Sequence, residues 1–176
     1  MTPFEQVFDW IEHTDLSLWV RGESYFAFPL ILTIHTIGMG FVAGIGSFIA
    51  IRILGFPADV PLAPLQKFYP AFWLGFAMNA ASGALLWFGY PYKAATNPVF
   101  YVKLCFIALG VYLAVRIRNE VLRAPYAAGG AVAIAMPRHA IMLARLSVFA
   151  WVGAITAGRL LAYTFTWLRV GIPGGF

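Results

Sequence analysis

The stretch from Leu30 to Leu54, LILTIHTIGMGFVAGIGSFIAIRIL, decides the fold because it is almost wholly apolar and contains one histidine, His35. A helix needs roughly 20 apolar residues to cross a hydrocarbon core about 30 Å thick. The stretch therefore predicts a transmembrane helix. A polar side chain at membrane depth is costly and usually faces the protein interior or a cavity, so His35 is the first candidate functional residue.

The composition of the whole chain predicts an integral membrane protein. Hydrophobic residues make up 61% of the 176 residues and charged residues 11%, whereas soluble proteins carry about 25% charged residues. The net charge of +5 lies in loops beside apolar runs, which is typical of membrane topology and not of a nucleic-acid surface. The single Cys105 excludes an internal disulfide and a cysteine-based zinc site.

We predict one all-α transmembrane domain over residues 1–176, a polytopic four-helix bundle preceded by an amphipathic interfacial helix over residues 3–20. The expected spans are about residues 26–52, 68–90, 99–115 and 140–168. Thr2 followed by Pro3 is typical of a helix start. His13, four residues after Asp9, is expected to be a solvated surface histidine.

Two features inside the predicted spans lead to further predictions. Gly40 and Gly44 have the small-xxx-small spacing that lets another backbone approach closely, either for helix packing or to admit a flat cofactor ring. Lys103, near the start of the third span, is expected to extend its side chain to the membrane interface.

Lysine and arginine placement predicts that both termini lie outside the cytoplasm. The cytoplasmic side would collect most of these residues, namely Arg52, Lys67, Arg116, Arg118, Arg123, Arg138 and Arg145.

Residue depth predicts a polar site near the membrane midplane, formed by His35, by Met78 and Asn79 of the second span, and by residues of the fourth. The residues of the fourth span are Thr156, Arg159 and Tyr163. No carboxylate falls inside a span, so Arg159 needs another partner. Backbone carbonyls with water, a lipid phosphate, an acid of a partner subunit, or a bound anion such as a haem propionate would each satisfy it.

His35 has two interpretations. A neutral imidazole can be an axial ligand of haem iron, as in membrane b-type cytochromes, and Met78 lies at a depth that suits a second ligand. Alternatively, His35 is hydrogen-bonded to Asn79, a threonine or a backbone carbonyl inside the bundle. His139 begins the fourth span near the cytoplasmic side and is too far along the helices to share an iron with His35.

No catalytic motif is present, so no catalytic residue is assigned. The chain lacks GxSxG, HExxH and P-loop sequences and paired carboxylates within a span. Whether the protein is an enzyme is left open. A redox role would make it an electron-transfer subunit and not a stand-alone enzyme.

Several motifs resemble a group of uncharacterised bacterial four-helix membrane proteins. They are IHTIGMGFVAG at residues 34–44, IRILGF at 51–56, SGALLWF at 82–88 and NPVFYVKL at 97–104. The histidine-then-glycine pattern is also distantly similar to CopD-type copper-resistance membrane proteins and b-type cytochrome bundles. This resemblance implies a bacterial inner-membrane protein and haem or copper handling. In such a membrane, the lysine and arginine placement puts both termini on the periplasmic side.

The leading hypothesis is a subunit that binds one b-type haem and takes part in electron transfer. His35 would ligate the iron, Arg159 would lie near a propionate, and Met78, Asn79 and Tyr163 would complete the site. The expected partners are the lipid bilayer and other membrane subunits or further copies of the chain, and not nucleic acid. The alternatives are an accessory subunit with a buried polar lock, whose amino-terminal helix docks a partner, and a small-molecule or metal permease.

Overall fold

The computed structural model describes residues 3–22, 26–123 and 136–167, and these ranges contain helices but no strand. The elements are α1 (Pro3–Glu12), α2 (Asp15–Arg21), α3 (Ala27–Ile53), the 3-10 helix η1 (Ala63–Phe68), α4 (Tyr69–Gly89), α5 (Pro91–Ala95), α6 (Pro98–Ile117), the π-helical turn η2 (Arg118–Leu122) and α7 (Arg138–Trp167). The predicted all-helical class is confirmed.

Four described segments are long and apolar enough to cross a membrane. They are Ala27–Ile53, Ala63–Gly89, Pro98–Leu122 and Arg138–Leu161. The described chain thus has as many helices able to cross a membrane as the sequence predicts spans, and together with the composition this indicates a membrane protein.

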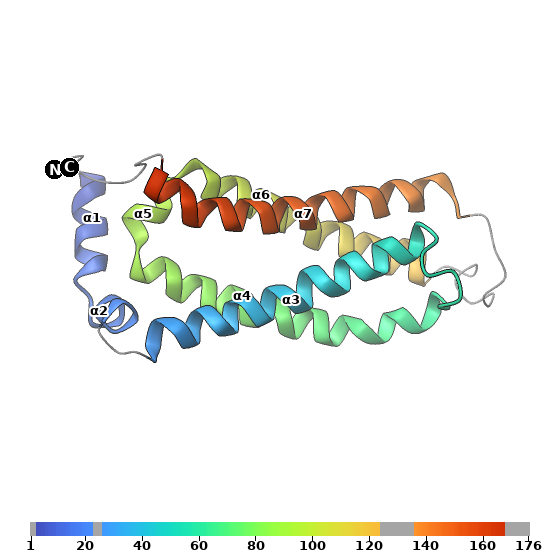
Figure 1. Ribbon diagram of the computed structural model, residues 1–176, viewed down its shortest axis with the longest axis horizontal. Coiled ribbons are helices and arrows are strands. Elements are labelled where there is room, and N and C mark those ends of the chain that lie inside the picture. The colour runs from blue at the N-terminus through green and yellow to red at the C-terminus, as the bar shows by residue number, and fades with distance from the viewer. Residues whose placement is uncertain (1–2, 23–25, 124–135, 168–176) are drawn as a thin grey trace.

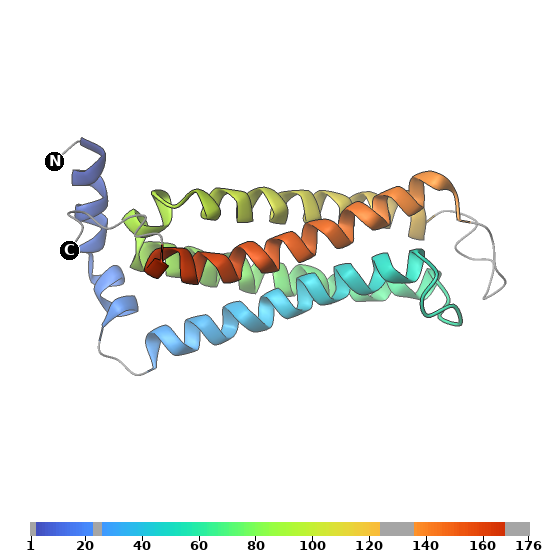
Figure 2. The same ribbon diagram turned by 45° about the horizontal axis from the view of Figure 1, so that its top comes forward.

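The long helices form two hairpins. α3 packs along α4, α6 packs along α7, and contacts between α3 and α7 join the hairpins (Figures 1 and 2). Among these described helices, α4 and α6 share no comparable contact. α1 lies across one end of the hairpins, beside α5. We call this the α1 end, and the opposite end, where η1 contacts η2, the η1 end.

The η1 end holds the dense core. Phe72, Ile117 and Leu122 are almost completely buried there. The Tyr69 hydroxyl donates to the Ala114 carbonyl at 2.7 Å, and Gln66 Nε2 donates to the Leu122 carbonyl at 2.7 Å. These bonds tie η1 and the start of α4 to η2 and α6, so the two hairpins are fastened most firmly at this end.

Trp151 of α7 fills the space between α3 and α6 because both helices present a glycine to it. A Cβ atom at Gly110 would lie 2.8 Å from Trp151 Cζ2, and a Cβ at Gly46 would meet Trp151 Nε1. The side chain is 2% exposed. It also makes an edge-on contact with Phe72 of α4, with ring centroids 6.0 Å apart. One residue therefore packs against all three other long helices.

Gly40 and Gly44 do not provide a packing point for a helix within the described chain. A Cβ atom at either position would meet no heavy atom within 4 Å. The close approach of α3 to α4 is instead at Gly38, where a Cβ would lie 2.8 Å from the Gly75 carbonyl oxygen. Glycines occur on both faces of α3, and their spacing alone does not identify the face that packs.

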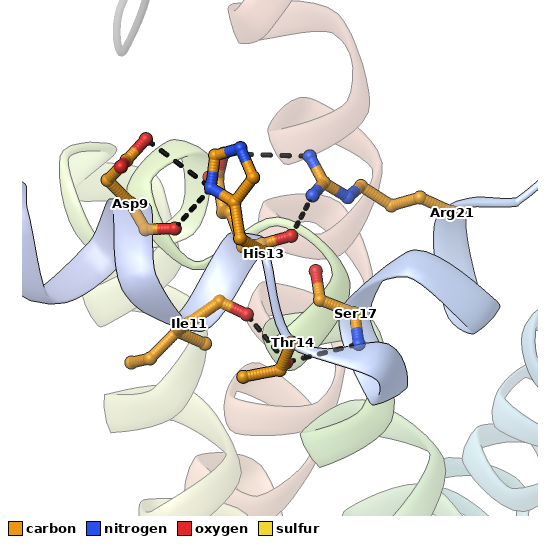
Figure 3. Close-up of polar contacts among 7 residues, drawn as sticks. Asp9, Ile11, His13, Thr14, Ser17 and Arg21 are labelled. Atoms are coloured by element: carbon orange, nitrogen blue, oxygen red, sulfur yellow. Dashed lines mark hydrogen bonds and ion pairs between the residues drawn. The ribbon is translucent and has the colours of Figure 1, made fainter.

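The predicted single helix over residues 3–20 is divided into α1 and α2. Thr14 caps α2, since its Oγ1 accepts from the Ser17 N–H at 3.4 Å and donates to the Ile11 carbonyl at 2.7 Å (Figure 3). A side chain that bonds the backbone in this way competes with helix continuation. His13 is exposed beside Asp9, as predicted. Thr2 lies outside the described residues.

The other helix limits differ from prediction by small amounts. α6 begins one residue earlier than expected because Asn97 caps it, with Oδ1 accepting from the Val99 N–H at 3.0 Å. It continues to Ile117 and then through η2, where a loop was predicted. The predicted turn after residue 90 contains α5. The predicted loop residues 124–135, and residue 168 of the fourth span, lie outside the described residues.

Gly46→Ala should lower the free energy of unfolding by about 1–3 kcal/mol, because the added methyl would displace the enclosed Trp151 indole. Gly44→Ala should stay within about 0.5 kcal/mol of wild type, since that position faces open space. Unfolding by SDS in detergent micelles, followed by circular dichroism, measures both. Equal losses in the two variants would contradict this account of the helix junction.

Candidate functional site

Hydrogen bonding indicates which ring nitrogen of His35 on α3 carries the proton. His35 Nδ1 lies 3.1 Å from the hydroxyl of Ser82 on α4, and that hydroxyl donates to the Met78 carbonyl at 2.6 Å. A serine hydroxyl has one proton, so Nδ1–H is the donor and Ser82 Oγ the acceptor. The free lone pair of the neutral imidazole is then on Nε2, which has no hydrogen-bond partner among the described residues.

α4 holds His35 at a second point. Asn79 Nδ2 donates to the His35 backbone carbonyl at 2.9 Å. Gly83, one residue after Ser82, leaves room for the ring, since a Cβ there would lie 3.2 Å from His35 Cε1. Backbone and imidazole are thus both fixed by the neighbouring helix.

His35 lines two neighbouring cavities of about 380 and 490 Å³. Both are lined by His35, Gly83, Trp87, Phe100 and Lys103. The larger one lies between α4 and α6, where the two helices are not in extended contact. The smaller one reaches α5 at the α1 end. We call the combined space the α4–α6 groove. Its size and mainly apolar lining are typical of sites for small organic ligands.

Lys103 of α6 does not extend to the interface, and that expectation is wrong. The half-buried side chain lines both cavities, and its Cε would lie 3.7 Å from a Cβ at Gly158 on α7. It also borders a small cavity of about 20 Å³ together with Asn79 and Trp151. The lysine stem thus lies inward beside α7, which sequence position did not reveal.

A second lysine lies where the groove reaches α5. Lys93 Nζ is 5.3 Å from the centre of the Tyr90 ring, and both residues line the smaller cavity. Burial lowers the pKa of the Lys93 amine below its ordinary value. The groove therefore has basic side chains both at its α5 end and deeper, at Lys103.

The structure brings together only part of the predicted site. His35 and Asn79 are hydrogen-bonded, and Met78 contributes its backbone carbonyl, but its side chain does not line the groove. Arg159 and Tyr163, like Thr156, are exposed on the outer face of α7. These three residues are separated by three, four and seven positions and therefore share one face of α7. Gly158 and Leu161, on another face of α7, line the groove instead.

Four contributors to the site were missed by sequence reasoning: Ser82, Trp87, Phe100 and Lys103. Ser82 could have been found, since it lies three residues after Asn79 on the same helix face. Lys103 could have been found by the argument applied to Arg159, because the predicted span that contains Lys103, residues 99–115, also has no Asp or Glu. The two aromatic residues carry no such signal in a chain so rich in aromatics.

The described residues contain no group of three or more His, Cys, Asp or Glu side chains that could hold a metal ion. Any metal held by the groove would have one protein imidazole as a ligand. Comparisons with protein-family models, curated proteins and solved structures found no match to this chain.

Asn79→Ala should lower the free energy of unfolding by about 0.6–2 kcal/mol, the usual range for a hydrogen bond between membrane helices. Thr36→Val is the matched control, because the Thr36 hydroxyl bonds only the Leu32 carbonyl of its own helix. SDS unfolding of both variants measures the difference. A loss in Thr36→Val as large as in Asn79→Ala would count against the interhelical role of Asn79.

Proposed function

We propose that this protein is a polytopic four-helix bundle of the bacterial inner membrane that binds one b-type haem through His35. It would take part in electron transfer within a larger membrane complex. The single observation that carries the proposal is the hydrogen bond between His35 Nδ1 and Ser82, which leaves Nε2 available on a residue that lines the α4–α6 groove. Metal-ligating histidines are commonly oriented in this way, by a bond from the other ring nitrogen.

The groove also suits the body of a haem. Trp87, Phe100 and Phe76 supply aromatic surface, and the two cavities are within the size range of cofactor sites. Haem iron bound there would accept and release one electron. The protein residues would orient the macrocycle, exclude water and keep the imidazole neutral. His35 is the one imidazole that the described lining of the groove offers as an axial ligand.

Charge distribution supports an orientation with both termini in the periplasm. Many basic residues lie at the η1 end, among them Arg52 and Arg118. Arg52 donates to the carbonyls of Val60 and Ala58 and so fixes the loop after α3. By the positive-inside rule this end is cytoplasmic. α1, which lies across the long helices, would then lie along the periplasmic surface of the membrane.

The alternative is an accessory subunit without a cofactor. It is favoured by one observation: the Asn79 and Ser82 bonds to His35 already join α3 to α4. In that case removal of the imidazole would lower stability without loss of any bound group. The same His35 variant therefore distinguishes the two functions when both its spectrum and its unfolding are measured.

Protein made with an adequate haem supply should show a Soret band whose position changes on reduction. His35→Ala should abolish this band, because the ligand to iron is lost. His13→Ala and His139→Ala should keep it, since neither residue lines the groove. Visible spectra of the purified oxidised and reduced proteins test this. A wild-type protein without a Soret band would refute haem binding.

Ser82→Ala should weaken haem binding by about 10- to 100-fold, because the imidazole would lose the partner that fixes its tautomer and orientation. Ser147→Ala is the control, since Ser147 is equally buried but lies on α7, away from His35. Haem titration followed by absorbance gives both affinities. If Ser82→Ala binds haem as wild type does, the orienting role of this hydroxyl is wrong.

A further inference from the structure

Lys103 is a cation that the four spanning helices do not neutralise. The sequence has no Asp or Glu between Ala27 and Ile53, in α4, in α6 or in α7. The described residues make no hydrogen bond or ion pair to its amine. Among the acids of the described residues, Glu120, which follows α6, pairs with Arg116, and Glu12 of α1 pairs with Arg21. A charged amine at membrane depth needs a partner, and the described residues do not supply one.

The side chain of Lys103 lies in the groove and not along a route to the membrane interface. Its side chain lines both cavities of the groove and the small cavity beside Asn79. Gly158 lies against its stem. His35 lines the same two cavities from α3. The groove thus presents a free imidazole nitrogen and an ammonium group within one apolar space.

We infer that Lys103 binds an acidic group of the ligand that occupies the α4–α6 groove. The ligand class is an apolar molecule that carries a carboxylate. This inference rests in part on the proposed function, because haem is such a molecule. It extends that function by naming Lys103, and not Arg159, as the residue that recognises the acid. Arg159 lies on the exposed face of α7 and lines neither cavity.

The position of Lys103 also sets the orientation of the ligand. Lys103 is on the second turn of α6, which begins beside α5 at the α1 end. Lys93 lines the same cavity on α5 itself. The acidic side of the ligand therefore points toward the α1 end, and its apolar body extends between α4 and α6. That opening between two spanning helices would face the bilayer, from which an apolar carboxylate can enter.

The test compares acids with their esters, which have the same body but no charge. Wild-type protein in detergent should bind protoporphyrin IX roughly 10- to 100-fold more tightly than its dimethyl ester, by fluorescence titration. Lys103→Met should lose this preference, mainly through weaker binding of the acid. Lys103→Arg should restore it. Lys67→Met, which removes an exposed lysine of η1, should keep the wild-type preference.

This probe contains no iron, so its result is independent of ligation by His35. If His35→Ala retains the preference for the acid but wild type shows no Soret band with haem, the haem proposal fails and the role of Lys103 stands. Oleate and methyl oleate form a second pair, which distinguishes a fatty-acid ligand from a porphyrin. Wild type that prefers the acid in neither pair overturns the inference. An equal preference in wild type and Lys103→Met also overturns it.

Discussion

The packing of Trp151 between Gly46 and Gly110 is the interaction on which the rest of the structure depends. The indole of α7 fits against α3 and α6 only because neither helix has a side chain at the point of contact. The joined helices then converge at the η1 end, where Tyr69 and Gln66 bond across to α6 and η2. Toward the α1 end nothing equivalent joins α4 to α6 in the described chain, and the groove is the space that is left.

The two polar groups of the groove come from different hairpins. His35 is on α3 and is oriented by Ser82 and Asn79 of α4, whereas Lys103 is on α6 and lies against α7. The site therefore exists only when the hairpins are docked, so stability and ligand binding should be coupled through the Trp151 junction.

The sequence predicted where the helices begin and end better than it predicted which of their faces point into the protein. Long apolar runs and capping residues such as Asn97 located the helices within a few residues. Depth along the spans correctly paired His35 with Asn79. The same argument put Arg159 at the right level but not on the inner face, because a helix that is apolar all round carries no pattern that distinguishes its faces. Lys103 and the packing glycines were misjudged for the same reason.

The central claim is that the α4–α6 groove is a ligand site with His35 as its anchor. An experimental density map of the protein, purified from its own membrane without added cofactor, tests this most directly. The account predicts continuous density between α4 and α6 that reaches His35 Nε2 and approaches the Lys103 amine. A map in which α4 and α6 close against each other, or in which lipid chains fill the groove without reaching either residue, would contradict it.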